Sequence, residues 1–261
     1  MDILIQSPEK CEQFCAMFQH IKFMTEHINI VFEKTQIYIQ CIDNSHVAIM
    51  ELRIPDSWFS RYDHANASNI TIGINVVLFH RILASREKNQ QIHLLFTEGE
   101  DTLAFHLTSE TKTEFDKHFE MPLIDVDAEI MEIPVIDYQA ELSLSSSHFY
   151  GLVHQLKMFG DTMDIQCSED RIMLASHSPN QGKMFVEINI DDLSAFAIEE
   201  NGKLDLSFSL SYLNNIMQYH KLAKEVEIGF SDSTPMKVKF GLVSEPPIEL
   251  VFYLAPKVNE D

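Results

Sequence analysis

Two small groups of residues in this sequence are of types that could hold a metal ion. Asp125 and Asp127 offer a pair of carboxylates, which could bind Mg²⁺ as in enzymes that act on phosphates. Their segment is acidic and flanked by prolines, however, which is typical of an exposed connector. Cys11 and Cys15 lie one helical turn apart with His20 nearby, but a structural zinc site needs four ligands at tighter spacing. We therefore expect buried thiols, and neither a metal site nor a cofactor.

Sequence motifs of the common catalytic types are absent. The chain contains no GxSxG, Walker, GxGxxG or HExxH pattern, and its eight glycines leave little material for a phosphate-binding loop. We therefore expect a binding protein and not an enzyme. The enzymatic alternative is a nuclease that uses Asp125 and Asp127 with Mg²⁺, and incubation with DNA and Mg²⁺ would test it.

Length and composition indicate a folded protein in a reducing compartment. The 261 residues are 45% hydrophobic and 23% charged, with eighteen Phe to supply a core. No apolar stretch approaches the ~18 residues of a membrane-spanning helix, and we expect no signal peptide at the start of the chain. The four cysteines form no CxxC pair, which favours reduced, buried thiols.

The pattern of apolar residues repeats once along the chain. A shift of 135 residues places residues 14–40 on residues 149–175, so that Phe14 meets Phe149. Few residues are identical, so the repeat is one of burial, and its persistence over most of each half argues against chance. Two similar domains are therefore predicted.

Each half contains two windows with apolar residues at three- and four-residue spacing, separated by alternating segments typical of antiparallel strands. The sequence therefore predicts an α+β protein in which each domain packs two helices on antiparallel sheets. The predicted helices cover residues 7–22, 75–88, 146–159 and 209–224. The predicted domains are 1–121 and 139–261, with a connector over 122–138.

Positive charge is concentrated in the four predicted helices. The chain has 19 Lys and Arg against 40 Asp and Glu, a net charge of −21, which by itself argues against a polyanionic partner. The four windows nevertheless contain eight Lys or Arg against three Glu, with five of the twelve His. Glu is as good a helix former as Lys, so helix propensity alone does not explain this bias. We interpret these helices as a surface that contacts phosphates without reading bases.

Six short motifs occur in a fixed order along the chain. They are Ile42-Asp43-Asn44-Ser45-His46-Val47, Leu123-Ile124-Asp125-Val126-Asp127, Ile133-Pro134, Gly160-Asp161, Tyr212-Leu213-Asn214 and Tyr253-Leu254-Ala255-Pro256-Lys257. In this combination the sequence resembles the proliferating cell nuclear antigen family, the eukaryotic-type DNA sliding clamps. The doubled architecture of that family agrees with the repeat, which was found independently.

The resemblance implies the DNA-clamp fold and a homotrimeric ring whose helices line the hole. Such a clamp encircles double-stranded DNA without sequence specificity and tethers a DNA polymerase and other replication and repair proteins. It is opened by an ATP-dependent loader and has no catalysis of its own. Lys22 and Arg81 match basic residues of the family's inner surface, and His154 stands where the family usually has Arg. With the other helix cations, the predicted DNA-binding residues are Lys10, Lys22, Arg81, Arg86, His154, Lys157, Lys221 and Lys224.

The resemblance also implies an apolar groove for peptides of partner proteins. A peptide with one aliphatic and two aromatic side chains would fill it, while its main chain pairs with the connector or the C-terminal tail. The predicted partner-binding residues are Ile42, His46, Val47, Ile49, Met131, Ile133, Pro134, Tyr138, Pro235, Tyr253, Leu254, Ala255 and Pro256.

The chain departs from the family pattern at several positions. The family's modifiable lysine corresponds to Glu169, and two inner-surface basic positions are Ala84 and Met158. Pro122 falls within the expected subunit-edge strand, where it removes a backbone donor. Such divergence fits a viral or protist clamp, and the alternative to a ring is a monomeric or dimeric clamp-fold DNA-binding or scaffold protein. We expect the protein in the nucleus, or at a cytoplasmic replication site if it is viral.

Overall fold

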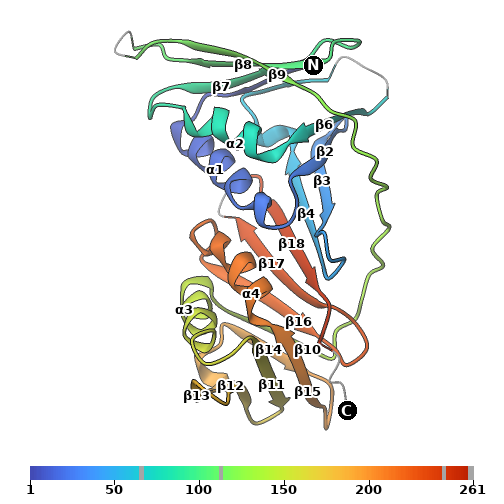
Figure 1. Cartoon of the computed structure of the whole chain (residues 1–261), viewed down its shortest axis with the longest axis vertical. Helices are drawn as coiled ribbons and strands as arrows, with labels where there is room; N and C mark the ends of the chain where they lie inside the picture. Colours follow the sequence, from blue (N-terminus) through green and yellow to red (C-terminus); the bar gives the residue numbers. More distant parts are fainter. Residues whose placement is uncertain (65–67, 112–113, 243–244, 258–261) are drawn as a thin grey trace. The chain divides into compact units, whose positions relative to one another are not determined.

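The structure, a computed structural model, describes residues 1–64, 68–111, 114–242 and 245–257 (Figure 1). The chain forms two units, each with its own core. Apart from the positions outside the described residues, unit 1 comprises Met1–Asn44, Glu51–Met131 and Val243–Glu249, and unit 2 comprises Ser45–Met50, Glu132–Leu242 and Leu250–Asp261. The predicted α+β class is confirmed, since both units contain few helices and much antiparallel sheet.

Unit 1 contains two groups of hydrogen-bonded strands. The first is an antiparallel sheet in the order β5-β1-β7-β8-β9, made of β5 (Arg61–Asp63), β1 (Asp2–Ile5), β7 (Gln91–Leu95), β8 (Thr102–Thr108) and β9 (Lys117–Pro122). The second has the order β4-β3-β2-β6, made of β4 (Ala48–Pro55, which enters unit 1 at Glu51), β3 (Gln36–Ile42), β2 (His27–Phe32) and β6 (Ile70–Asn75). A short 3-10 turn, η2 (Asp56–Trp58), follows β4. Burial alternates along β8, as expected of a sheet that covers a core with one face.

The helices of unit 1 are α1 (Pro8–Gln19), the 3-10 turn η1 (Ile21–Phe23) and α2 (Val76–Ala84). Figure 1 shows α1 and α2 side by side, and they pack through aromatic rings. The ring centroids of Phe18 and Phe79 are 4.5 Å apart, and Phe79 also contacts Phe105 of β8 at 5.2 Å. The hydroxyl of Ser7 and the side-chain oxygen of Asn75 cap the two helices by accepting backbone N–H groups.

Unit 2 has the same two-sheet construction. One group has the order β14-β10-β16-β17-β18, made of β14 (Ala195–Ile198), β10 (Ala140–Ser145), β16 (Glu225–Phe230), β17 (Met236–Leu242) and β18 (Ile248–Leu254). The other has the order β13-β12-β11-β15, made of β13 (Gly182–Ile188), β12 (Ile172–Ser178), β11 (Thr162–Ser168) and β15 (Lys203–Ser209). The helical elements are α3 (Ser146–Leu156), η3 (Ile190–Asp192), α4 (Leu210–Ile216) and η4 (Met217–Lys221).

The predicted repeat is confirmed at the level of strand register. Ile30 of β2 lies opposite Ile39 of β3, and the residues 135 positions later, Ile165 and Leu174, lie opposite each other in β11 and β12. All four side chains are buried. This shared register explains why the apolar pattern repeats, because a register shift of one residue would turn the buried side chains towards solvent.

All four predicted helices are shorter than the windows that predicted them, and the second and fourth differ most. α2 ends at Ala84, and not at residue 88, because the Ser85 hydroxyl donates to the carbonyl of Ile82 and a turn follows. The last window divides into α4 and the 3-10 turn η4, so that Lys224 lies beyond both. Apolar spacing continued past these ends, and hydrogen bonds to the last carbonyls decided where each helix stops.

The cysteines are free thiols, as predicted, and three of them are buried. Burial raises the pKa of Cys11 and Cys167 to about 11 and that of Cys41 to about 12, so these thiols are protonated and unreactive. Across the described ranges, no cluster of three His, Cys, Asp or Glu residues is arranged to hold a metal ion. In the same part of the chain, no helix has the length and apolar character needed to cross a membrane.

Phe79 is the residue on which the core of unit 1 most directly depends, because it contacts rings of α1 and of β8 and is fully buried. We expect Phe79→Ala to lower the free energy of unfolding by ~3–5 kcal/mol, since the cavity would be lined by groups from three elements. Urea denaturation measures this change. Phe115→Ala is the matched control, because that ring is 89% exposed; equal losses in the two variants would contradict the assignment of Phe79 to the core.

Candidate nucleic-acid interface and connector

The helical face of unit 1 brings together Lys22, His80 and Arg81. Lys22 lies on η1 and is exposed, and η1 packs against α2. On α2 the exposed positions are Val77, Arg81 and Ala84, which share one face opposite the core. Burial, and then the charge of Lys22, lower the pKa of His80, which places the lysine close to that imidazole. Lys22 and Arg81 are therefore exposed cations on two helical elements that pack together, with His80 beside the lysine.

Two other predicted cations of unit 1 are already used inside the protein. The ammonium of Lys10 donates to the backbone carbonyl of Trp58 at 2.6 Å and lies 5.2 Å from the centre of its ring. The side chain of Arg86 is only 6% exposed, and its guanidinium donates to the carbonyls of Glu87, Lys88 and Gln90 at 2.8–3.0 Å. Arg86 is thus a buried residue that stabilises a turn, which corrects its assignment to a DNA-contacting surface, whereas Lys10 keeps some exposure and its assignment stays a prediction.

In unit 2, α3 and η4 pack together and carry the remaining predicted cations. The rings of Tyr150 and His220 stack with centroids 4.0 Å apart, and His154 stacks on Tyr150 at 6.0 Å. His154 and Lys221 are exposed on this face, and Lys157 caps the end of α3. Lys224 is also exposed, in the turn after η4. Tyr150 was not predicted, although its four-residue spacing from His154 placed the two on one helix face.

Five helical elements of the two faces share one property of composition, whereas α1 carries Glu9 and Glu12. The described ranges of η1, α2, α3, α4 and η4 contain no Asp or Glu at all, although the chain has 40 such residues. A phosphate chain that approached these faces would therefore meet cations and neutral groups. Carboxylates on the same faces would oppose its approach by like-charge repulsion.

The first part of the predicted connector lies along unit 1. The N–H of Ile124 donates to the carbonyl of Gly73 at 3.0 Å, and the side-chain amide of Asn29 donates to the carbonyl of Val126 at 3.0 Å. A Cβ atom on residue 73 would stand 2.1 Å from the Ile124 oxygen. Gly73 is therefore required for this close approach of two backbones.

Further along, one side chain holds the connector by both of its amide atoms. The amide nitrogen of Gln40 donates to the Met131 carbonyl at 2.8 Å, and its oxygen accepts the Met131 N–H at 2.7 Å. The side chains of Ile130 and Met131 stay 55% and 48% exposed. Sequence reasoning missed Gln40, since a glutamine on a strand gives no signal of what it contacts 91 residues away.

The last part of the connector packs on unit 2. The ring of Tyr138 covers Gly229 of β16, where an added Cβ would lie 2.7 Å from the ring. The ammonium of Lys237 is 5.8 Å from the centre of the same ring. Burial, followed by the nearby Tyr253 and Glu141, raises the pKa of Tyr138 to about 12, so its hydroxyl stays neutral. Tyr138 thus anchors this end of the connector.

The other predicted partner-binding residues divide between the two units. Ile42 and Met131 belong to unit 1, and the rest belong to unit 2. Within unit 2, the N–H of Ala255 donates to the carbonyl of Val47 at 2.9 Å, which brings the tail beside the loop before β4. Leu254 is fully buried and is a core residue, which corrects its assignment to a contact surface. The predicted residues of unit 2 that keep some exposure are His46, Val47, Ile49, Ile133, Pro134, Tyr138, Pro235, Tyr253, Ala255 and Pro256.

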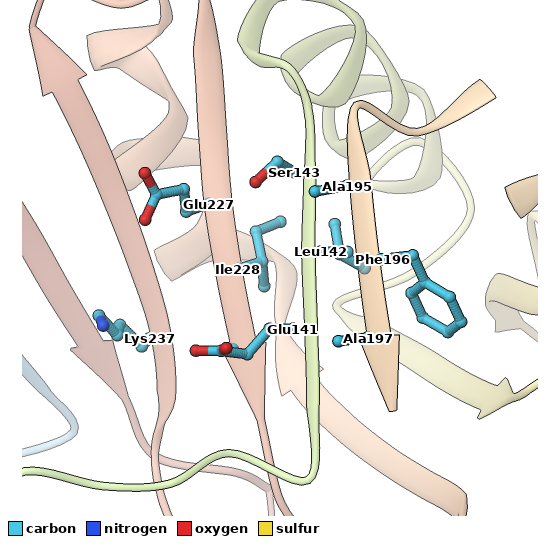
Figure 2. Close-up of a pocket in the computed structure, with 10 residues that line it drawn as sticks. Glu141, Leu142, Ser143, Ala195, Phe196, Ala197, Glu227, Ile228 and Lys237 are labelled. Carbon is cyan, nitrogen blue, oxygen red and sulfur yellow. The ribbon is translucent and has the colours of Figure 1, made fainter. Parts of the chain in front are cut away.

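A cavity of about 210 Å³ opens on the sheet beside Tyr138 (Figure 2). Its charged lining residues are Glu141, Glu227 and Lys237, whose side chains come from three neighbouring strands. Ser143 also lines it, but no histidine among the ten lining residues could act as its base. This hollow therefore has no arrangement for nucleophilic catalysis.

The contacts of Gly73 give a prediction about the connector. We expect Gly73→Ala to displace residues 123–126, because its Cβ cannot coexist with the Ile124 carbonyl. The connector should then be cut by a protease at least about tenfold faster, since cleavage follows the population of the opened segment. Gly151→Ala is the control, on α3, where nothing lies within 4 Å of the new Cβ and the backbone has no positive φ. Equal cleavage rates in the parent protein and Gly73→Ala would show that the close contact does not hold the connector.

Comparison with known proteins agrees with this doubled arrangement. The family model described as proliferating cell nuclear antigen, N-terminal domain, matches residues 10–130, and the model of the C-terminal domain matches residues 132–257. The proliferating cell nuclear antigen of Chaetomium thermophilum is 25% identical over 245 residues, which cover 92% of this chain and 93% of that protein. The chain therefore belongs to the proliferating cell nuclear antigen family, and it is a DNA sliding clamp without catalytic activity.

Proposed function

We propose that this clamp holds duplex DNA through the cationic helix faces of its two units. The observation that carries this proposal is the absence of carboxylates from η1, α2, α3, α4 and η4 in a chain of net charge −21. Phosphate contacts by flexible lysines and arginines are independent of sequence and screened by salt, which suits a protein that must move along DNA. The proposed contact residues are Lys22, Arg81, His154, Lys157, Lys221 and Lys224.

The acidic remainder of the chain supports the same proposal. DNA that meets the sheets encounters a surplus of negative charge and is repelled. Only the helix faces then attract it, so that binding elsewhere on the protein is discouraged. The protein is thereby able to hold a polyanion in spite of its net charge.

The ring would close through two of the free sheet edges, β9 of unit 1 and β13 of unit 2, each paired on one side only among the described strands. A head-to-tail contact of two different edges generates a closed ring when the rotation between neighbouring subunits brings the last subunit back to the first. Here that ring would be a homotrimer. Phe185 of β13 is 67% exposed and would be covered by the neighbouring subunit. Pro122 is the last residue of β9, so its missing N–H removes a donor only at the end of that edge.

Partner proteins would bind at the connector and the tail. Ile130, Met131 and Val135 expose apolar side chains on a segment that is held at Gly73 and Gln40 and anchored again by Tyr138. A short peptide with aliphatic and aromatic side chains would cover them, with its main chain paired to the connector. We propose a DNA polymerase as the principal partner, and an ATP-dependent loader that opens the ring.

The experiment that tests the function compares closed circular DNA with the same DNA after linearisation. A ring should remain on the closed circle and slide off the linear molecule, because it is linked to DNA by topology. The alternative, a monomeric or dimeric clamp-fold protein, would be released equally from both. Mass measurement in solution gives an independent answer, since a stable mass of one or two chains would contradict the trimer.

Charge variants of the helix faces give a prediction on salt dependence. The slope of log K against log salt should fall by about one for each phosphate-binding cation that a substitution removes, so we expect shallower slopes for Arg81→Gln and Lys221→Gln. Fluorescence anisotropy of a short duplex at several salt concentrations measures the slope. Lys34→Gln, at an exposed lysine in the turn between β2 and β3, serves as the control. A slope that Arg81→Gln and Lys221→Gln leave unchanged would remove these faces from the DNA contact.

His80 gives a prediction on pH. Its pKa is lowered by burial and by Lys22, so it is neutral at pH 8 and gains a proton only below the usual histidine range. Bound phosphate favours the protonated form, and duplex affinity should therefore rise as the pH falls from 8 to 5.5. We expect the increase in duplex affinity between pH 8 and pH 5.5 to be about threefold smaller in His80→Gln than in the parent protein. The affinity at pH 8 should be unchanged. A pH profile identical to that of the parent would exclude His80 from the contact.

A further inference from the structure

Phe23 and Met158 are large apolar side chains at equivalent places in the two units. The 135-residue shift that relates the units places Lys22 on Lys157 and Phe23 on Met158. Phe23 is 46% exposed and Met158 is 58% exposed. Each unit therefore ends its first helical segment with a lysine followed by an exposed apolar side chain.

Folding does not require either side chain to be apolar. Ile21 and Leu156, the residues directly before the two lysines, are fully buried and supply the contact with the core. Phe23 and Met158 follow on the other side of each lysine and leave much of their surface in water, at a cost that grows with the exposed apolar area. The same position in both units is thus apolar for a reason other than core packing.

In unit 1 the exposed ring has a defined orientation. Phe23 stacks on His20 with centroids 5.9 Å apart and planes 9° from parallel. The ammonium of Lys22 is 5.6 Å from the centre of the same ring. A cation and an apolar surface are therefore presented together.

In unit 2 the backbone around Met158 is fixed by a tight contact. The Met158 N–H donates to the Gln155 carbonyl at 3.1 Å, which closes the turn after α3. Two residues later, Gly160 approaches the His177 carbonyl so closely that a Cβ there would lie 2.6 Å from its oxygen. Met158 is thereby held beside Lys157, while its flexible thioether side chain can adapt to a surface.

We infer that Phe23 and Met158 contact the deoxyribose groups of the DNA held by this clamp. The inference rests on the proposed function, in which Lys22 and Lys157 bind phosphates. Each phosphate in DNA is next to a sugar whose C–H groups are apolar, so a lysine followed by an apolar side chain matches that alternation. Burial of sugar against Phe or Met releases no counterions, and its contribution to affinity is therefore independent of salt. It is also the same for every base sequence.

The positive charge beside each side chain selects this occupant. A protein partner would need a wider apolar patch, whereas unit 1 offers only Phe23 and Val77 and unit 2 only Met158 as exposed large apolar side chains on the described helical elements and the turns after them, among Lys, Arg and His. The faces that carry Phe23 and Met158 contain no carboxylate in η1, α2, α3, α4 or η4. Duplex DNA is the partner that satisfies both features.

Salt titration of a short duplex separates the two kinds of contact. The double variant F23A/M158A should lower the binding constant about fivefold at every salt concentration, with the slope unchanged. The double variant K22Q/K157Q should instead make the slope shallower. Phe115→Ala is the matched control for loss of an exposed ring, and it should change neither quantity. Circular dichroism and the urea midpoint verify that all variants are folded.

The outcomes are distinguishable. If F23A/M158A binds as the parent does while K22Q/K157Q has a shallower slope, the inference is overturned and the proposed function stands. If K22Q/K157Q keeps the parent slope, the lysine contacts of the proposed function fail, whatever the apolar variants do. If F23A/M158A no longer bound a partner peptide while its duplex binding stayed intact, Phe23 and Met158 would belong to a protein contact. That result would also overturn the inference.

Discussion

The constraint on which this protein depends is repulsion between like charges. With a net charge of −21 the chain can hold DNA only through a surface from which carboxylates are missing. Five helical elements satisfy that condition, and they or the turns directly after them carry Lys22, Arg81, Lys157, Lys221 and Lys224. The strands and loops carry nearly all of the acid. The carboxylates are therefore kept off these five elements, and this lets an acidic protein act on a polyanion.

The fold provides such a face twice because one α+β unit is duplicated. In each unit the helices bury one face on a sheet. Phe79 of α2 in unit 1 and Phe208 of β15 in unit 2 are among the fully buried side chains of these cores. The opposite face is then free to carry charge without any effect on the core. The two ends of the connector lie against the sheets, because Gly73 and Gly229 have no Cβ that would block this close packing. The middle of the connector exposes Ile130 and Val135.

The repeat, the antiparallel α+β class and the places of the helices could be predicted from the sequence, because burial imposes a local periodicity on the chain. The individual contacts could not. Lys10 and Arg86 were counted as free cations, yet carbonyl groups of Trp58 and of the turn after α2 accept their hydrogen bonds. Gln40 meets Met131 only because the fold brings distant segments together. Such contacts depend on where a side chain points, which composition and spacing do not encode.

A sliding clamp needs contacts that hold DNA without fixing its position. Ionic contacts alone meet this need poorly at physiological salt, because each one weakens as counterions compete for the phosphates. Apolar contact with the sugars compensates, since it does not depend on salt and recurs at every nucleotide. A step along the duplex exchanges one sugar for the next at nearly equal free energy. Cations beside apolar side chains therefore give this clamp a hold that salt cannot abolish and that still permits movement.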